Sequence, residues 1–278
     1  MTPQQSFDDL IVSVKLRHKL ETAIQRYELN VDTRLREWGI EQTVSGHRIC
    51  DKDEAPLLML YSGPSGTGKT FAAGAFAQQL GKDLLVTDIS KLLSAWVGES
   101  EQNVRRMFYL FDRVVRRCQK PPVLLMNECD QFLTTRGESS KSVDRMYHQM
   151  QNLFLEGFER MRGILIATTN LVGHIDSAFS RRFHLKLEFP MPDVESRLKL
   201  WQKHLLPTIP LDKDVDVDYL ADKYEFSGGQ IDLVVRNAAI QAAVRGDRVT
   251  QSDLINACET ELMGAKSVVG GFKGVVGF

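Results

Sequence analysis

The stretch LLMLYSGPSGTGKT, residues 57–70, decides the fold of this chain. It begins with an apolar run typical of a buried strand, and GPSGTGKT (63–70) then matches the pattern G-x-x-x-x-G-K-[ST]. An Ala-rich helical pattern follows, so strand, glycine-rich loop and helix occur in the order of a phosphate-binding loop. The alternative is a plain glycine-rich turn before a helix, and the complete motif in its strand-to-helix context argues against it.

Each residue type in this loop has a chemical reason. Gly66 and Gly68 allow the backbone to wrap around a phosphate chain with its N–H groups pointing inward. Lys69 can reach the β- and γ-phosphates, and Thr70 supplies a hydroxyl to Mg²⁺ at a helix N-terminus. The motif therefore predicts ATP and Mg²⁺ as ligands. The loop residues expected to contact the nucleotide are Pro64, Ser65, Gly66, Thr67, Gly68, Lys69, Thr70 and Phe71.

Length and composition set the class of protein. The 278 residues are 43% hydrophobic and 26% charged, which is ordinary for a globular protein with a sizeable core. The net charge of −1 favours neither nucleic acid nor an anionic membrane as a partner. No apolar run approaches the ~20 residues of a membrane-spanning helix, and the four scattered cysteines lack metal-ligand spacing. We expect a cytoplasmic protein.

Short apolar runs alternate with helical patterns through the first two thirds of the chain. The expected strands are 57–62, 83–88, 123–127, 163–170 and 184–189. Strands separated by helices predict a mainly parallel sheet covered on both faces, an α/β fold of the P-loop αβα type.

The pattern changes after FPMPD (189–193), where two prolines suit a hinge. Helices are expected at 194–205, 216–223, 228–245 and 250–263, with Ser227 and Thr250 as N-caps. The predicted domains are an N-terminal helical segment (1–50), a large nucleotide-binding domain (51–190), a helical lid (191–263) and a Gly/Val/Phe-rich tail (264–278).

LLMNECD (124–130) is the second motif, at the end of the third expected strand. Parallel strands point their last residues at the ligand crevice, so Asn127 should lie near the Mg²⁺ shell. Glu128 is then in position to take a proton from the attacking water. In the nucleotide hydrolases that this run resembles, an Asp usually stands where Asn127 stands. An amide oxygen accepts hydrogen bonds as a carboxylate does, but without the negative charge. Asp130 is expected to cap the turn or the following helix.

With these motifs in order, the chain resembles the AAA+ ATPases, and within them the AAA clade of protein-remodelling ring ATPases. The resemblance runs from Ser6 to about Met263. It implies a large αβα domain, a helical lid and assembly into rings, commonly hexamers, with nucleotide between neighbouring subunits. The Asn at position 127 resembles a variant found in some bacterial members.

The resemblance also implies roles for residues outside the two motifs. SFDDLIV (6–12), with Asp9 and Ile11, is similar to the entry segment that passes near the adenine. In IATTN (166–170), Asn170 would orient the attacking water or contact the γ-phosphate. The lid region SGGQIDLVVRNAA (227–239) is similar to the sensor-2 region. The lid residues assigned to the nucleotide are Leu200, Gly228 and Gly229.

Two further segments are similar to parts of the family that act between subunits or on substrate. IDSAFSRRF (175–183) resembles the segment with arginine fingers, so Arg181 and Arg182 would reach the neighbour's site. The family often separates its two arginines by Pro-Gly. Here they are adjacent, which leaves open which of the two is the arginine finger. SAWVGES (94–100) resembles a pore loop. The pore residues implied are Trp96, Val97 and Gly98, with TTRGESSKS (134–142) as a second loop.

The expected function is a ring-forming ATPase that slowly hydrolyses ATP with Mg²⁺ to remodel, unfold or thread a protein. Its partners would be other copies of the chain and a protein substrate or adaptor. Two alternatives stay open. A DNA-directed AAA+ loader or regulator would need a basic strip, whereas an assembly switch would bind ATP with little or no hydrolysis, for which Asn127 is the best sign. The tail is expected to dock on the lid or on a neighbouring subunit.

Overall fold

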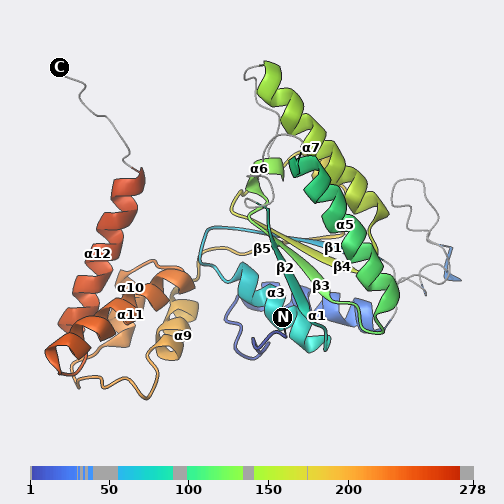
Figure 1. Ribbon diagram of the computed structural model, residues 1–278. Helices are drawn as coiled ribbons and strands as arrows, with labels where there is room; N and C mark the ends of the chain where they lie inside the picture. The colour runs from blue at the N-terminus through green and yellow to red at the C-terminus, as the bar shows by residue number, and fades with distance from the viewer. Residues whose placement is uncertain are drawn as a thin grey trace, which may run out of the picture. The chain divides into compact units, whose positions relative to one another are not determined.

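The computed structural model describes most of the chain in two units (Figure 1). The described residues are 2–29, 31, 34, 37–39, 56–89, 99–133, 141–173 and 175–269. The first unit comprises Met1–Pro64 and Gly68–Pro190, and the second comprises Ser65–Thr67 and Met191–Phe278. Most of both expected pore loops and the last residues of the tail lie outside the described residues.

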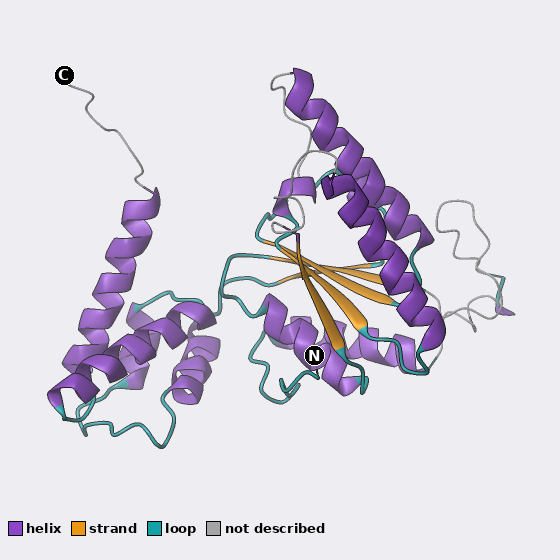
Figure 2. Cartoon of the chain, viewed as in Figure 1, coloured by secondary structure: helices purple, strands orange, loops and turns teal. Residues whose placement is uncertain are grey.

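The first unit contains a five-stranded sheet in the order β2-β3-β4-β1-β5, with every neighbouring pair parallel (Figure 2). The strands are β1 (Leu57–Ser62), β2 (Leu84–Asp88), β3 (Val123–Asn127), β4 (Ile164–Thr169) and β5 (Leu185–Glu188). All five expected strands are present, each within one residue of its predicted ends, and the predicted α/β fold is confirmed.

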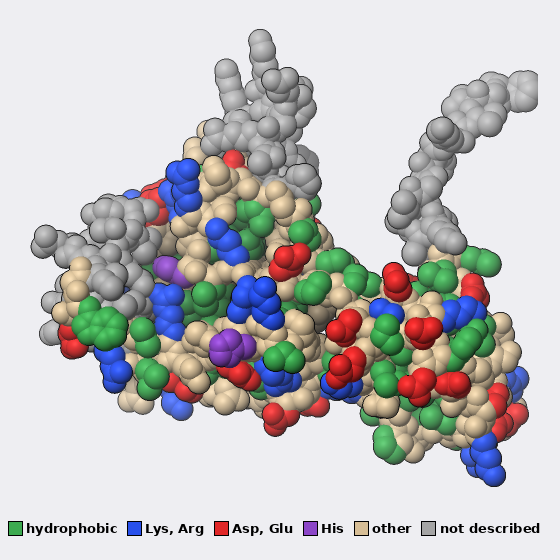
Figure 3. Space-filling view, turned by 180° about the vertical axis from the view of Figure 1, so that it is seen from behind, with side chains coloured by type: hydrophobic (Ala, Val, Ile, Leu, Met, Phe, Trp, Pro, Cys, Tyr) green, Lys and Arg blue, Asp and Glu red, His purple; other side chains and the backbone are tan. Residues whose placement is uncertain are grey.

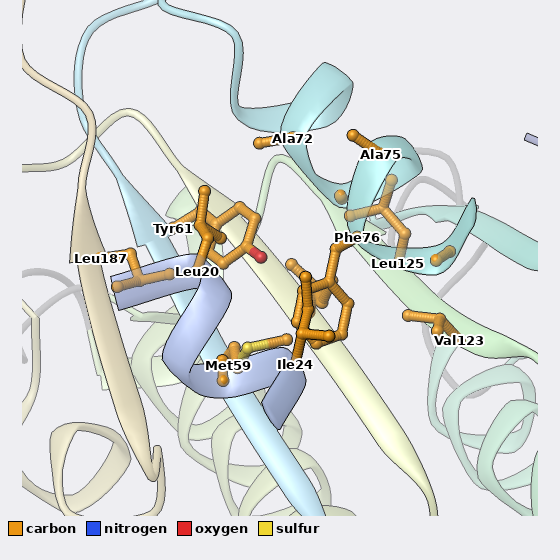
Figure 4. Close-up of a cluster of buried hydrophobic side chains, with 14 of the residues drawn as sticks. Leu20, Ile24, Met59, Tyr61, Ala72, Ala75, Phe76, Val123, Leu125 and Leu187 are labelled. Carbon is orange, nitrogen blue, oxygen red and sulfur yellow. The ribbon is translucent and has the colours of Figure 1, made fainter. Parts of the chain in front are cut away.

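Helices cover both faces of this sheet because its strands alternate apolar side chains between the two sides. On one side lie α1 (Val14–Glu28) and α3 (Lys69–Gln79) (Figure 1). The close-up shows Leu20 and Ile24 of α1 and Phe76 of α3 gathered over Met59 and Tyr61 of β1 (Figure 4).

The other face of the sheet carries α5 (Glu99–Arg117), α6 (Asp130–Leu133) and α7 (Lys141–Arg160). Its core is aromatic, and the rings of Phe132 and Phe154 stack with centroids 4.0 Å apart. A Cβ on Gly157 would lie 2.4 Å from the ring of Phe108, so the glycine lets α7 approach α5. The short α8 (Ser177–Ser180) follows β4.

The second unit is helical, as the sequence predicts, with α9 (Val194–His204), α10 (Val217–Lys223), α11 (Gly228–Arg245) and α12 (Gln251–Val269). Trp201 and Phe226 are fully buried in its core. Ser227 is the N-cap of α11 in a capping box with Gln230, which confirms the expected cap.

The last helix ends later than the sequence pattern predicts. α12 continues to Val269, six residues past the expected end at 263. A single glycine, Gly264, costs a helix only about 1 kcal/mol, so it does not end α12. Within the described residues, no helix is long and apolar enough to span a bilayer.

Candidate nucleotide-binding site

The glycine-rich loop follows β1 and leads into α3. Gly63 has a φ of 145°, and a Cβ there would meet the carbonyl oxygen of Phe189 at 2.1 Å. Gly68 has a φ of 91° in the left-handed region and forms the N-cap of α3. Only glycine adopts these conformations readily, so the sequence fixes a loop whose backbone can turn its N–H groups toward an anion.

Lys69, the first residue of α3, is buried, and its ammonium group donates to three acceptors. Its Nζ donates to the carbonyl oxygens of Gly63 and Pro64, both at 2.7 Å, and to Oδ1 of Asn170 at 3.0 Å. Burial lowers the pKa of Lys69, and the nearby charge of Asp130 opposes that effect. The cation is thus held between the loop and the end of β4.

The ends of β3 and β4 are joined by the hydroxyl of Thr168. This hydroxyl donates to Oδ1 of Asn127 at 3.1 Å and accepts from the backbone N–H of Glu128 at 3.3 Å. Thr70 at the start of α3 donates to the same Asn127 oxygen at 3.4 Å. The residues expected from the two motifs therefore lie together at the carboxyl edge of the sheet, where parallel sheets bind ligands.

Glu128 has an unusual backbone conformation. Its φ of 58° is the one positive value among the described non-glycine residues. A non-glycine residue in the left-handed region costs roughly 1–2 kcal/mol, and such strain is concentrated at functional sites. The Glu128 side chain is exposed, one residue past the end of β3.

Asp130 differs from its expected role as a cap. It is the first residue of α6, and its carboxylate bonds to the end of β4 instead. Oδ1 accepts from the Thr169 hydroxyl at 2.5 Å and from the backbone N–H of Asn170 at 2.9 Å, while Oδ2 accepts from Nδ2 of Asn170 at 3.3 Å. The sequence motifs did not indicate these contacts of Asp130, Thr168 and Thr169. The pair of threonines that closes an apolar strand is a signal that could have indicated the last two.

The two adjacent arginines have different surroundings. Arg182 donates from Nε to Oε1 of Glu159 at 3.1 Å, makes a second contact to that oxygen from Nη2, and donates from Nη1 to the carbonyl of Ala178 at 2.7 Å. Arg181 is exposed, and its side chain has no hydrogen bond or ion pair within the described part of the chain.

The remaining expected nucleotide contacts are dispersed. In the first unit, Asp9 is exposed and Ile11 is half-buried. Phe71, in the first turn of α3, packs against the hydrophobic core. In the second unit, a Cβ on Gly228 would lie 3.3 Å from Leu200.

Two more of the expected contacts lie at the glycine-rich loop. The second unit includes the loop tip Ser65–Thr67, and in it the Gly229 amide donates to the carbonyl of Gly66 at 3.0 Å. Trp96, Val97 and Gly98 fall outside the described residues.

A magnesium ion would fit the polar atoms that this site offers. The described residues contain no cluster of three His, Cys, Asp or Glu side chains able to hold a metal. Thr70 and Asn127 instead share a hydrogen bond beside the loop, so their oxygens would act together with the phosphates of a bound nucleotide. Mg²⁺, when bound, would neutralise phosphate charge during phosphoryl transfer.

A glycine-rich loop after β1, its lysine and the polar ends of β3 and β4 on a parallel αβα sheet define a P-loop nucleoside triphosphatase. Residues 59–191 match the family described as "ATPase family associated with various cellular activities (AAA)". The chain therefore carries an AAA ATPase domain over these residues.

The chain is also similar to three curated proteins. The chain is 32% identical to the meiotic spindle formation protein mei-1 of Caenorhabditis elegans over 195 residues, 68% of this chain and 40% of the relative. It is 35% identical to the cell division cycle protein 48 homolog of Archaeoglobus fulgidus over 193 residues, 67% of this chain and 25% of the relative. It is 32% identical to the ATP-dependent zinc metalloprotease FtsH 3 of Sphaerobacter thermophilus over 217 residues, 75% of this chain and 43% of the relative. The chain thus spans less than half the length of these relatives.

Proposed function

We propose that this chain is a subunit of a ring-shaped ATPase, most simply a hexamer, that uses ATP and Mg²⁺ to remodel, unfold or thread a protein. The observation that carries the proposal is the joint arrangement of Lys69, Asn127 and Asn170 beside Glu128. The relatives' names refer to spindle formation, the cell division cycle and ATP-dependent proteolysis, which concern different targets. From the last of these names we extend ATP-dependent action on protein to this chain.

Glu128 is our candidate for the general base of hydrolysis. Its positive φ and the bond from its N–H to Thr168 direct the residue out of the strand at the edge where the loop lies. Its carboxylate would take a proton from the water that attacks the γ-phosphate. Lys69 would stabilise the charge that develops on the phosphate, exchanging a loop carbonyl for a phosphate oxygen.

We propose that Asn127 slows turnover without abolishing it. Its Oδ1 accepts from Thr70 and from Thr168, so the amide keeps the hydrogen-bonding place of a carboxylate. It contributes no negative charge, which weakens the hold on Mg²⁺-bound water while Lys69 still attracts the phosphates.

Steady-state phosphate release by the wild type and by Glu128→Gln tests hydrolysis directly. Because the substitution keeps the size of the side chain and removes its basicity, the variant should fall to the no-enzyme background. Equal rates at background level in both proteins would contradict hydrolysis. They would favour the second candidate, an assembly switch in which ATP holds the ring without turnover, provided that ATP still drives oligomerisation by native mass measurement.

In the proposed ring, Trp96, Val97 and Gly98 line the pore and contact the substrate. An aromatic side chain can grip varied polypeptide without selecting its sequence, because much of its contact is apolar and non-directional. Trp96→Ala should therefore abolish ATP-dependent unfolding of a tagged protein while phosphate release continues. Unfolding at the wild-type rate would remove Trp96 from this role.

A further inference from the structure

The orientation of the Asn170 amide is determined by its two neighbours. Lys69 can only donate hydrogen bonds and its Nζ lies 3.0 Å from one amide atom, so that atom must be the oxygen. The ionised carboxylate of Asp130 can only accept and lies 3.3 Å from the other atom, so that atom must be the nitrogen. The flipped amide would place NH₂ against ammonium and oxygen against carboxylate, and both contacts would be repulsive.

Asp130 holds more than the amide nitrogen. Its Oδ1 also accepts from the backbone N–H of Asn170 and from the hydroxyl of Thr169, so one carboxylate fixes both the main chain and the side chain at the end of β4. Thr169 itself accepts from the N–H of Leu171 at 3.1 Å, which stabilises the turn beyond the strand. This anchoring explains how an exposed Asn170 can keep one orientation.

We propose that Asp130 is a positioning residue for hydrolysis: it holds Asn170 so that the amide oxygen, and not the amide nitrogen, faces Lys69 and the phosphate site. This inference rests on the proposed ATPase function and makes it more specific. An oxygen facing the site accepts a hydrogen bond from the attacking water, whereas a nitrogen would donate to the γ-phosphate. Asp130 thereby gives Asn170 the role of orienting the attacking water and not that of binding the γ-phosphate.

The isosteric variant Asp130→Asn tests the proposal without removing volume. Its oxygen can keep the contacts to Thr169 and to the Asn170 backbone, while its new NH₂ faces Nδ2 of Asn170, donor against donor. The Asn170 amide nitrogen then loses the acceptor that holds it away from Lys69, so the amide oxygen is no longer fixed toward the phosphate site. We expect kcat to fall ~10- to 100-fold, the range seen when a hydrogen-bond partner behind a reacting group is lost, with the Kd of a fluorescent ATP analogue changed by less than about threefold.

A double variant separates positioning from general support of the fold. If Asp130 acts through Asn170, then Asp130→Asn/Asn170→Ala should be no slower than Asn170→Ala alone. Asp83→Asn, an exposed carboxylate just before β2, is the matched control and should retain wild-type kcat. Wild-type kcat in Asp130→Asn, or effects of the two substitutions that multiply, would overturn the proposal.

A readout without catalysis keeps this inference distinct from the proposed function. A wild-type rate equal to that of Glu128→Gln would refute hydrolysis, yet the Asn170 contact could still be measured. The side-chain NH₂ resonance of Asn170, assigned by its loss in Asn170→Ala, should shift in Asp130→Asn and stay in place in Asp83→Asn. An unchanged resonance in Asp130→Asn would overturn the positioning role whatever the rate of hydrolysis.

Discussion

Arg182 is tied to Glu159 by hydrogen bonds from both Nε and Nη2 of its guanidinium, with the Nε contact at 3.1 Å. A third bond from Nη1 reaches the carbonyl of Ala178 one turn earlier. These contacts hold α8 against α7 and engage the Arg182 side chain within its own subunit. We therefore propose Arg181, which is exposed at the end of α8, as the arginine that reaches a neighbouring site.

The adjacent arginines form a matched pair for mutation. Arg181→Ala should lower kcat by ~10³-fold, the lower end of arginine-finger effects, and leave the thermal unfolding midpoint unchanged. Arg182→Ala should keep kcat within about tenfold of wild type and lower the free energy of unfolding by about 1 kcal/mol, since the pair with Glu159 is partly exposed. Phosphate release and urea unfolding distinguish the two.

Mixed rings test whether Arg181 acts on a neighbour. Arg181→Ala subunits keep an intact loop lysine, whereas Lys69→Ala subunits keep an intact finger. Mixing the two inactive proteins should therefore recover part of the wild-type rate. No recovery, or a larger loss of kcat in Arg182→Ala than in Arg181→Ala, would mean that Arg181 is not the trans-acting residue.

Restoring the carboxylate at position 127 should strengthen the response to Mg²⁺. Asn127→Asp places a negative charge where Oδ1 now accepts from Thr70 and Thr168, so less Mg²⁺ should be needed for half-maximal phosphate release. Asn127→Ala is the control and should need more. An unchanged Mg²⁺ dependence in both variants would place the side chain outside the metal's surroundings.

The stability of the second unit should depend on Asp253 at low pH. Arg245 donates to both carboxylate oxygens at 2.6 and 2.7 Å, which lowers the pKa of Asp253; burial opposes this shift, and bonds from Thr250 add to it. A lowered folded-state pKa contributes stability that is full above the unfolded value of about 3.9 and is lost as the pH falls below it.

Asp253→Asn should consequently lower the free energy of unfolding at pH 7 by roughly 1–2 kcal/mol. Its deficit relative to wild type should shrink as the pH is lowered from about 4, because the wild-type carboxylate then becomes protonated. Urea unfolding followed by far-UV circular dichroism measures the difference, and Asp247→Asn is an exposed control from the same unit. A deficit that stays constant down to pH 2 would contradict the role of the charge.

Local sequence determined those parts of the protein where the backbone conformation depends on the residue type, such as strands, glycine turns and helix starts. The run 57–70 predicted β1, the glycine-rich loop and α3, because apolar strands, left-handed glycines and helix starts have short-range signatures. The ends of the other strands were predicted from the short apolar runs that alternate with helical patterns along the chain. The sequence also identified Lys69, Glu128 and Asn170 as candidates, since each stands at a fixed offset within a motif.

Contacts between distant segments decided what the motifs left open. Asp130 and Asn170 are 40 residues apart, and only the pairing of β3 with β4 brings the carboxylate to the amide. Arg181 and Arg182 have the same chemistry in sequence, and the packing of α8 on α7 separates them, because one reaches Glu159 and the other does not. Local pattern therefore indicated a nucleotide-binding protein. Hydrogen bonds across the sheet and between helices determined which of its polar side chains are held within the subunit and which stay exposed.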